Sequence, residues 1–179
     1  MLNDHRLDDE YAGNEFPLAY LITFRTFGTW LHGDERGSVT RQPKSIRESK
    51  RRDINIPLRE RMTEKMDTEP VVLDRTQRKV VQDAIREVCH HRGYVLYALN
   101  VRSNHGHVVV HANAKPERVS DSMKGYATRR LRELGLVDAN QQIWSRGRSR
   151  RYLWKSRHVE AAVDYVLYCQ SDVPFELDD

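Results

Sequence analysis

The chain has 179 residues, of which 39% are hydrophobic and 31% charged, and its 30 Lys and Arg against 26 Asp and Glu give a formal net charge of +4. This length suits one domain with a single core, and no apolar run approaches the length of a membrane-spanning helix. Because the acidic start lacks the apolar segment of a secretory signal and Cys89 and Cys169 form no disulfide or zinc pattern, we expect a cytoplasmic protein without a membrane partner.

The predicted domain covers residues 18–175 and follows a tail at 1–17. Its first segment, LAYLITFRTFGTW at 18–30, is rich in Thr, aromatic and β-branched residues and predicts a strand that ends near Gly28. A long loop insertion follows at about 32–72, where no hydrophobic period is sustained.

A helix and two strands come next. Asp74 is typical of a helix N-cap, the apolar residues after it recur at helical spacing, and Gly93 is typical of a helix end. The runs YVLYALNV (94–101) and HVVVHA (107–112) then predict two strands.

Pro116 and Gly135 bracket a second, basic helix, and a linker continues through Gly147. The run RRYLW at 150–154 predicts a short strand, and a last helix begins near Ser156. The order β-α-β-β-α-β-α predicts an α+β fold: a ferredoxin-like, split β-α-β antiparallel sheet with helices on one face, plus a C-terminal helix. Such a topology leaves the other sheet face free for a ligand or a partner.

Two histidines flank a glycine in the sequence SNHGHVVV. Side chains alternate along a strand, so His105 and His107 should share one face, about 6–7 Å apart along the strand. Two imidazoles at that spacing can bind one divalent ion if one or two oxygen ligands come from elsewhere. The alternative is a pair of histidines on a solvated surface, and His111 has the same parity.

The last predicted helix carries Tyr165 and is followed by Gln170, whose side-chain amide can bind a metal ion or form a hydrogen bond. A tyrosine on an amphipathic helix is ordinarily a core residue. A phenol with a pKa near 10 is a weak nucleophile at neutral pH, but a metal ion that polarises a phosphate promotes its attack. The pattern therefore fits phosphoryl transfer through a covalent phosphotyrosine.

Between residues 115 and 157 the chain has twelve Lys and Arg against four Asp and Glu, which favours a polyanionic partner. The predicted DNA-binding residues are Lys124, Arg129, Arg130, Arg146, Arg148, Arg150, Arg151, Lys155 and Arg157. Trp144 and Trp154 lie in the same part of the chain, and exposed aromatic rings can stack on unpaired bases. The position of Trp154 inside RRYLW favours a core role for that residue.

The His-x-His strand, the late Tyr–Gln helix and the element order resemble those of single-tyrosine HUH transposases. The segments FRTFGTWLHGDERG and VRSNHGHVVV resemble the REP-associated tyrosine transposase (RAYT) branch, and the resemblance covers about residues 18–175. It implies that His105 and His107 bind Mg²⁺ or Mn²⁺ with Gln170 as a third ligand, and that Tyr165 attacks single-stranded DNA to form a 5′-phosphotyrosine. It also implies hairpin or palindromic repeat DNA as substrate, with a homodimer as an alternative to a monomer.

The chain departs from that family pattern at two positions. Gly106 stands where the family usually has a bulky hydrophobic residue, and Cys169 stands four residues after Tyr165, where the family usually has its polar partner. Tyr168 is therefore the alternative nucleophile, with Tyr126 third. Two other functions stay open: a non-catalytic single-stranded nucleic-acid-binding module of the same fold, and a two-histidine metal hydrolase that uses activated water.

Overall fold

The computed structural model describes residues 15–29, 38–39, 51–52 and 69–168. Most of the predicted tail and most of the predicted insertion lie outside these ranges. Inside the insertion, β2 (Ser38–Val39) and β3 (Arg51–Arg52) pair as an antiparallel two-stranded ladder.

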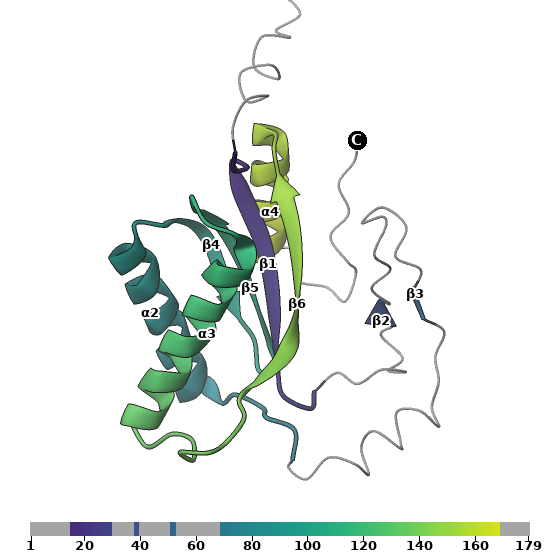
Figure 1. Ribbon diagram of the computed structural model, residues 1–179. Coiled ribbons are helices and arrows are strands. Elements are labelled where there is room, and N and C mark those ends of the chain that lie inside the picture. Colours follow the sequence, from purple (N-terminus) through teal and green to yellow (C-terminus); the bar gives the residue numbers. More distant parts are fainter. Residues whose placement is uncertain (1–14, 30–37, 40–50, 53–68, 169–179) are drawn as a thin grey trace, which may run out of the picture.

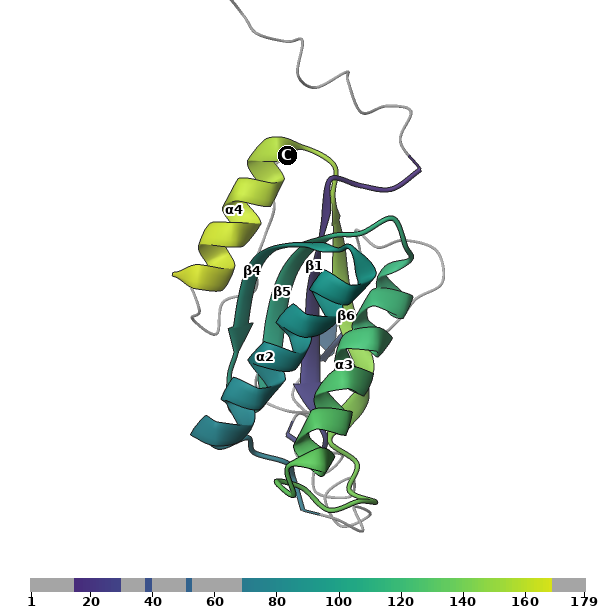
Figure 2. The same ribbon diagram turned by 90° about the vertical axis from the view of Figure 1, so that its left-hand side faces the viewer.

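The other elements build one sheet with helices on both of its faces (Figures 1 and 2). In chain order they are β1 (Ala19–Thr26), α2 (Arg75–Arg92), β4 (Val95–Val101), β5 (His105–His111), α3 (Pro116–Glu133), β6 (Trp144–Leu153) and α4 (Ser156–Leu167). The four strands lie in the order β4-β5-β1-β6, and all neighbours are antiparallel. This is the predicted α+β, ferredoxin-like arrangement. None of the described helices is both long and apolar enough to cross a membrane.

Local signals in the sequence account for the helix ends. Asp74 caps α2 through a capping box, in which its side chain accepts from the Gln77 backbone and the Gln77 side chain accepts from the Asp74 backbone. Gly93 ends α2 in the left-handed conformation, with φ of 67°. Pro116 begins α3, where its missing N–H costs nothing. These predicted boundaries are confirmed.

Two features differ from the sequence-based expectation. The strand β6 begins at Trp144, well before the predicted start at 150, and it pairs with β1 along most of its length. It is an edge strand whose arginines reach solvent or acidic groups on α3, so it lacks the hydrophobic alternation that marks a half-buried strand. The second sheet face is also not free throughout, because α4 packs on it.

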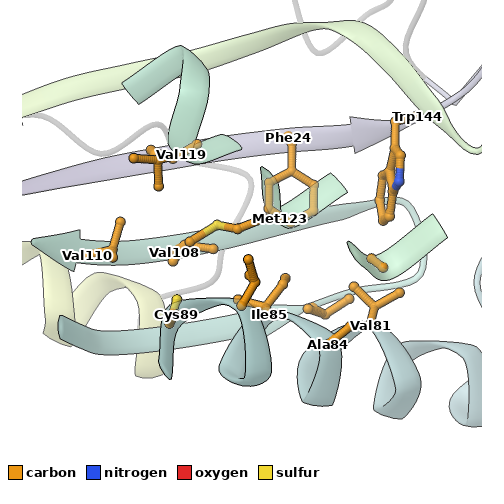
Figure 3. Packing of buried hydrophobic residues seen from close by; sticks show 14 of the residues in the cluster. Phe24, Val81, Ala84, Ile85, Cys89, Val108, Val110, Val119, Met123 and Trp144 are labelled. Carbon is orange, nitrogen blue, oxygen red and sulfur yellow. The ribbon is translucent and has the colours of Figure 1, made fainter. Parts of the chain in front are cut away.

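The main core fills the space between the sheet and the helices α2 and α3 (Figure 3). Even-numbered residues of β1 and β5 point into it, including Phe24 and Val108, together with Ile85 of α2 and Met123 of α3. A smaller cluster lies on the opposite face under α4. Its buried members are Ala19, Leu21, Ala98, Val109, Leu153, Ala162 and Val166.

The departure at Gly106 has a packing explanation. Gly106 faces the main core directly beside Phe24 of β1, its register partner. A Cβ atom at position 106 would lie 2.7 Å from Cζ and 2.9 Å from Cε2 of the Phe24 ring. Phe24 is buried and meets Trp144 edge-to-face at 5.2 Å between ring centroids. The ring of Phe24 thus fills the volume next to position 106 that a larger residue there would need.

Gly106→Ala should destabilise the fold by about 1–3 kcal/mol, because the new methyl overpacks a closed core. Combining it with Phe24→Leu should cost less than the two separate losses added together, since the shorter side chain makes room for the methyl. Chemical denaturation of the four proteins in this cycle measures the coupling. Strictly additive losses would show that the two positions do not share one space.

Candidate functional site

The two histidines of β5 lie on the sheet face that carries α4. His105 and His107 share this face with Val109, which belongs to the cluster under α4. Their ring centroids are 4.8 Å apart and the rings stand at 80° to each other. Across the strand pair, His105 is the register partner of Arg25 and His107 that of Thr23. The predicted common face is therefore confirmed.

A polar side chain engages the Nδ1 atom of each histidine. The Nδ1 of His105 lies 2.7 Å from Oδ1 of Asn104, and the Nδ1 of His107 lies 2.8 Å from the hydroxyl of Thr23. Because an amide oxygen only accepts, the Nδ1 of His105 donates in this contact, which leaves Nε2 as the ring nitrogen that can face a metal ion. Histidines that bind metal ions are commonly oriented in this way, through the second ring nitrogen.

The electrostatic surroundings keep His107 uncharged. Burial lowers the pKa of His107 to about 3, and the positive charge of His105, Arg25 and Arg102 acts in the same direction. A neutral imidazole is the form that coordinates a metal ion. His107 is therefore in its ligand form at neutral pH.

The helix α4 places a tyrosine against this pair. The ring of Tyr165 meets that of His107 edge-to-face, with centroids 5.6 Å apart, and its other side packs on the cluster under α4. The last turn of α4 is fastened to the sheet by Asn100, the register partner of His107 on β4, which donates to the carbonyl of Val166 at 3.2 Å. Burial raises the pKa of Tyr165 and nearby Arg151 opposes that shift, so the phenol is protonated at neutral pH.

The alternative tyrosines have different surroundings. Tyr168 follows the last residue of α4 and is 79% exposed. Tyr126 is on α3, across the sheet from the histidines, and contacts His91 and Arg129. Gln170, the predicted third metal ligand, lies outside the described residues, as does Cys169.

The described residues fit a divalent metal ion. With metal–nitrogen bonds of about 2.1 Å and ring centres about 1.2 Å beyond each nitrogen, two imidazoles bound at about 90° have their centres about 4.6 Å apart. The observed 4.8 Å leaves room for an ion between the two rings, and it is also an ordinary distance for an edge-to-face ring pair. No group of three His, Cys, Asp or Glu residues gathers anywhere in the described ranges, so no described acidic, His or Cys side chain completes a set of three with His105 and His107.

Several predicted DNA-binding residues have partners inside the protein. The ammonium of Lys124 is buried and donates to the carbonyls of Ser145 and Gly147 in β6. Arg130 forms ion pairs with Glu87 of α2 and with Glu133. These interactions hold α2, α3 and β6 together.

Arg148 and Arg150 of β6 lie on the face of the sheet that carries α3. Arg148 pairs with Asp121 at 2.9 Å and also donates to the carbonyl of Glu117, and Arg150 pairs with the Glu117 carboxylate at 2.7 Å. Sequence spacing could not reveal these contacts, because they depend on which face of β6 meets α3. Both residues lie across the sheet from the histidines.

The remaining predicted cations lie nearer the solvent. Arg151 lies on the histidine face, because its register partner Leu21 belongs to the cluster under α4. It is close enough to Tyr165 to affect the pKa of that residue. Arg146 and Arg157 are exposed and Lys155 is partly exposed, while Arg129 lies 5.1 Å from the ring centre of Tyr126.

The prediction for Trp154 is wrong. Trp154 was predicted in the core but is 43% exposed, because it follows the last residue of β6. Trp144 is buried against Phe24, and its indole donates to the carbonyl of Lys124 and the hydroxyl of Thr128. Trp154 is the one of the two that can stack on a base.

Lys124 gives the fold a pH dependence. Burial lowers the pKa of Lys124 from 10.5 to about 8, assisted by Arg148 and opposed by Asp121. Between about pH 8 and 10.5 the unfolded chain then binds more protons than the folded one, so the free energy of unfolding should rise with pH across this window. Urea denaturation of the wild type and of Lys124→Met should show a growing difference in favour of the wild type. A difference that stays constant would contradict it.

Five residues of this site were not identified from the sequence: Thr23, Arg25, Asn100, Arg102 and Asn104. Each acts through strand register or through the turn between β4 and β5, where the backbone N–H of Arg102 donates to the carbonyl of His105 at 2.7 Å. One signal in the sequence could have found two of them: Thr23 and Arg25 are two residues apart on a predicted strand, so their side chains share one face.

The sequence of the chain matches one family of known proteins. The family model of IS200-like transposases matches residues 66–166, which include both histidines and Tyr165. No curated protein matches the chain in sequence.

Two solved structures are similar to the chain. A REP-associated tyrosine transposase bound to a REP hairpin has 14% identity and a TM-score of 0.47, over 83% of this chain and 63% of that one. This chain thus spans less than two thirds of that protein's length. A candidate transposase from Deinococcus radiodurans R1 also has 14% identity and a TM-score of 0.47, over 88% of this chain and 94% of that one.

Proposed function

Because the chain belongs to the family of IS200-like transposases, we propose that it is a metal-dependent endonuclease and strand transferase of single-stranded DNA that uses Tyr165 as its nucleophile. The observation that carries this proposal is the contact of the Tyr165 ring with His107, which is uncharged and shares one sheet face with His105. If Tyr165 were only a core residue, its packing would not require two histidine side chains beside it.

Each residue has a role in this proposal. His105 and His107 would hold Mg²⁺ or Mn²⁺, with Gln170 as a further ligand. The bound ion would polarise the scissile phosphate as a Lewis acid. The phenol of Tyr165 loses its proton as its oxygen bonds to phosphorus, and the bond to the 3′-oxygen breaks. That oxygen takes up a proton and leaves as a free hydroxyl, so the DNA is attached as a 5′-phosphotyrosine.

The DNA partner follows from charge and exposure. Arg146, Lys155 and Arg157 form no ion pair with other residues that the structure describes, so they can contact phosphates, and Arg151 adds positive charge beside Tyr165. Trp154 can stack on an unpaired base. The resemblance to the RAYT branch supports hairpin or palindromic repeat DNA as the substrate. Such a protein would act in the cytoplasm, where the chromosome is accessible, as a monomer or a homodimer.

The proposal is tested by incubating labelled single-stranded hairpin DNA with the protein and Mn²⁺, with and without EDTA, followed by a denaturing gel. A metal-dependent band of protein-linked DNA is the expected result. Binding that depends on salt but not on metal, with no adduct across a panel of hairpins, would instead favour the non-catalytic binding module. Cleavage without an adduct would favour the two-histidine hydrolase.

A further inference from the structure

We propose that Arg25 and Arg102 form a phosphate-binding site beside the histidines, so that a DNA phosphate and the divalent ion bind cooperatively. This inference rests on the proposed function and names two residues that recognise the substrate there. It concerns arginines outside the basic stretch between residues 115 and 157.

Arg25 lies on the histidine face of the sheet. It is the register partner of His105 and is two residues from Thr23, whose hydroxyl contacts His107. Residues two apart on a strand share a face, and directly opposed residues have their Cβ atoms about 4.5–5.5 Å apart. The side chain of Arg25 therefore leaves the sheet beside that of His105, and the residue is partly buried.

Arg102 flanks the histidines from the opposite strand. It follows the last residue of β4, and its backbone N–H donates to the carbonyl of His105, which fixes it at the turn into β5. Its side chain is exposed. The histidine pair thus has an arginine on β1 on one side and an arginine at the end of β4 on the other. Both are close enough to act electrostatically on His107.

This charge arrangement is unusual for a site that binds a cation. Both histidine ligands are neutral when they coordinate, and no cluster of three acidic, His or Cys ligands exists among the described residues. The two guanidiniums repel a divalent ion. A phosphate group would compensate both kinds of positive charge, because its oxygens can bind the ion and accept paired hydrogen bonds from arginine.

Two ligands that compensate each other's charge must each raise the affinity for the other. The ion alone should bind weakly, and single-stranded DNA should strengthen its binding through the scissile phosphate. Such a site would bind the metal ion firmly only when substrate is present.

The test measures Mn²⁺ affinity by electron paramagnetic resonance, alone and with saturating oligothymidylate of about ten nucleotides, a length that covers one single-strand site. The parent protein carries Tyr165→Phe, so the DNA stays intact. In this parent we expect the oligonucleotide to tighten Mn²⁺ binding about tenfold or more, as a charge-assisted contact allows. Adding Arg25→Gln should leave binding of Mn²⁺ alone unchanged or tighter, and should reduce the enhancement about tenfold.

Arg86→Gln is the matched control, because Arg86 is an exposed arginine of α2 on the opposite side of the sheet, paired with Asp83. It should keep the full enhancement. The inference is overturned if Arg25→Gln keeps the enhancement, or if it weakens Mn²⁺ binding equally with and without DNA. A parent protein that binds no Mn²⁺ under either condition would overturn the proposed function itself, which separates the two failures.

Discussion

Tyr165→Phe should abolish the covalent protein–DNA adduct, by at least about a thousandfold, because it removes the nucleophilic oxygen and keeps the ring. The phenylalanine ring keeps the edge-to-face contact with His107 and the packing on the cluster under α4. Folding and single-strand binding should therefore stay at wild-type levels. A denaturing gel reports the adduct, and fluorescence anisotropy reports binding.

Tyr168→Phe is the matched control for that change. It is the same substitution three residues along the chain, at a side chain that is 79% exposed. Adduct formation should persist in this variant. An adduct that persists in Tyr165→Phe and disappears in Tyr168→Phe would assign the nucleophile to Tyr168.

His107→Ala should reduce adduct formation about a hundredfold or more, because polarisation of the phosphate by a bound ion is worth several kcal/mol. Removal of this imidazole leaves His105 as the one histidine ligand. Mn²⁺ binding should fall together with activity, which a direct binding measurement can verify. Added Mn²⁺ at high concentration should restore part of the rate, since the affinity for the ion is what has been lost.

His111→Ala is the corresponding control on the same strand. His111 has the same parity as the two histidines but lies at the far end of β5, where its Nδ1 donates to the carbonyl of Leu18 at 3.0 Å. Its loss should leave Mn²⁺ binding unchanged. Equal effects of His107→Ala and His111→Ala would point to general damage to the strand.

Much of the fold could be predicted because its boundaries are encoded locally. Asp74, Gly93 and Pro116 each mark a helix end through their own backbone and side-chain chemistry. Alternation along β5 placed both histidines on one face without knowledge of their neighbours. The tyrosine helix could be recognised in the same way, from its apolar spacing.

The remaining features depend on contacts between distant segments. The register of β1 against β5 places Phe24 beside Gly106 and Arg25 beside His105, and no local pattern specifies that register. The same holds for Lys124, whose long side chain is buried and reaches the carbonyls of Ser145 and Gly147 in β6 although it lies in a strongly basic helix. A run of cations in the sequence therefore does not reveal which of them have partners inside the protein.

The central claim is that the tyrosine beside His107 carries the DNA, and peptide mass spectrometry of the adduct tests it most directly. Trypsin cleaves after Arg157, and no Lys or Arg lies between His158 and Tyr168, so Tyr165 and Tyr168 share the peptide that begins at His158. Cleavage of this peptide between the two tyrosines in the mass spectrometer gives fragments that show which tyrosine carries the nucleotide. After incubation with hairpin DNA and Mn²⁺ and digestion by nuclease, the nucleotide mass should lie on Tyr165. A nucleotide on Tyr168 or Tyr126, or a peptide without any, would contradict the account.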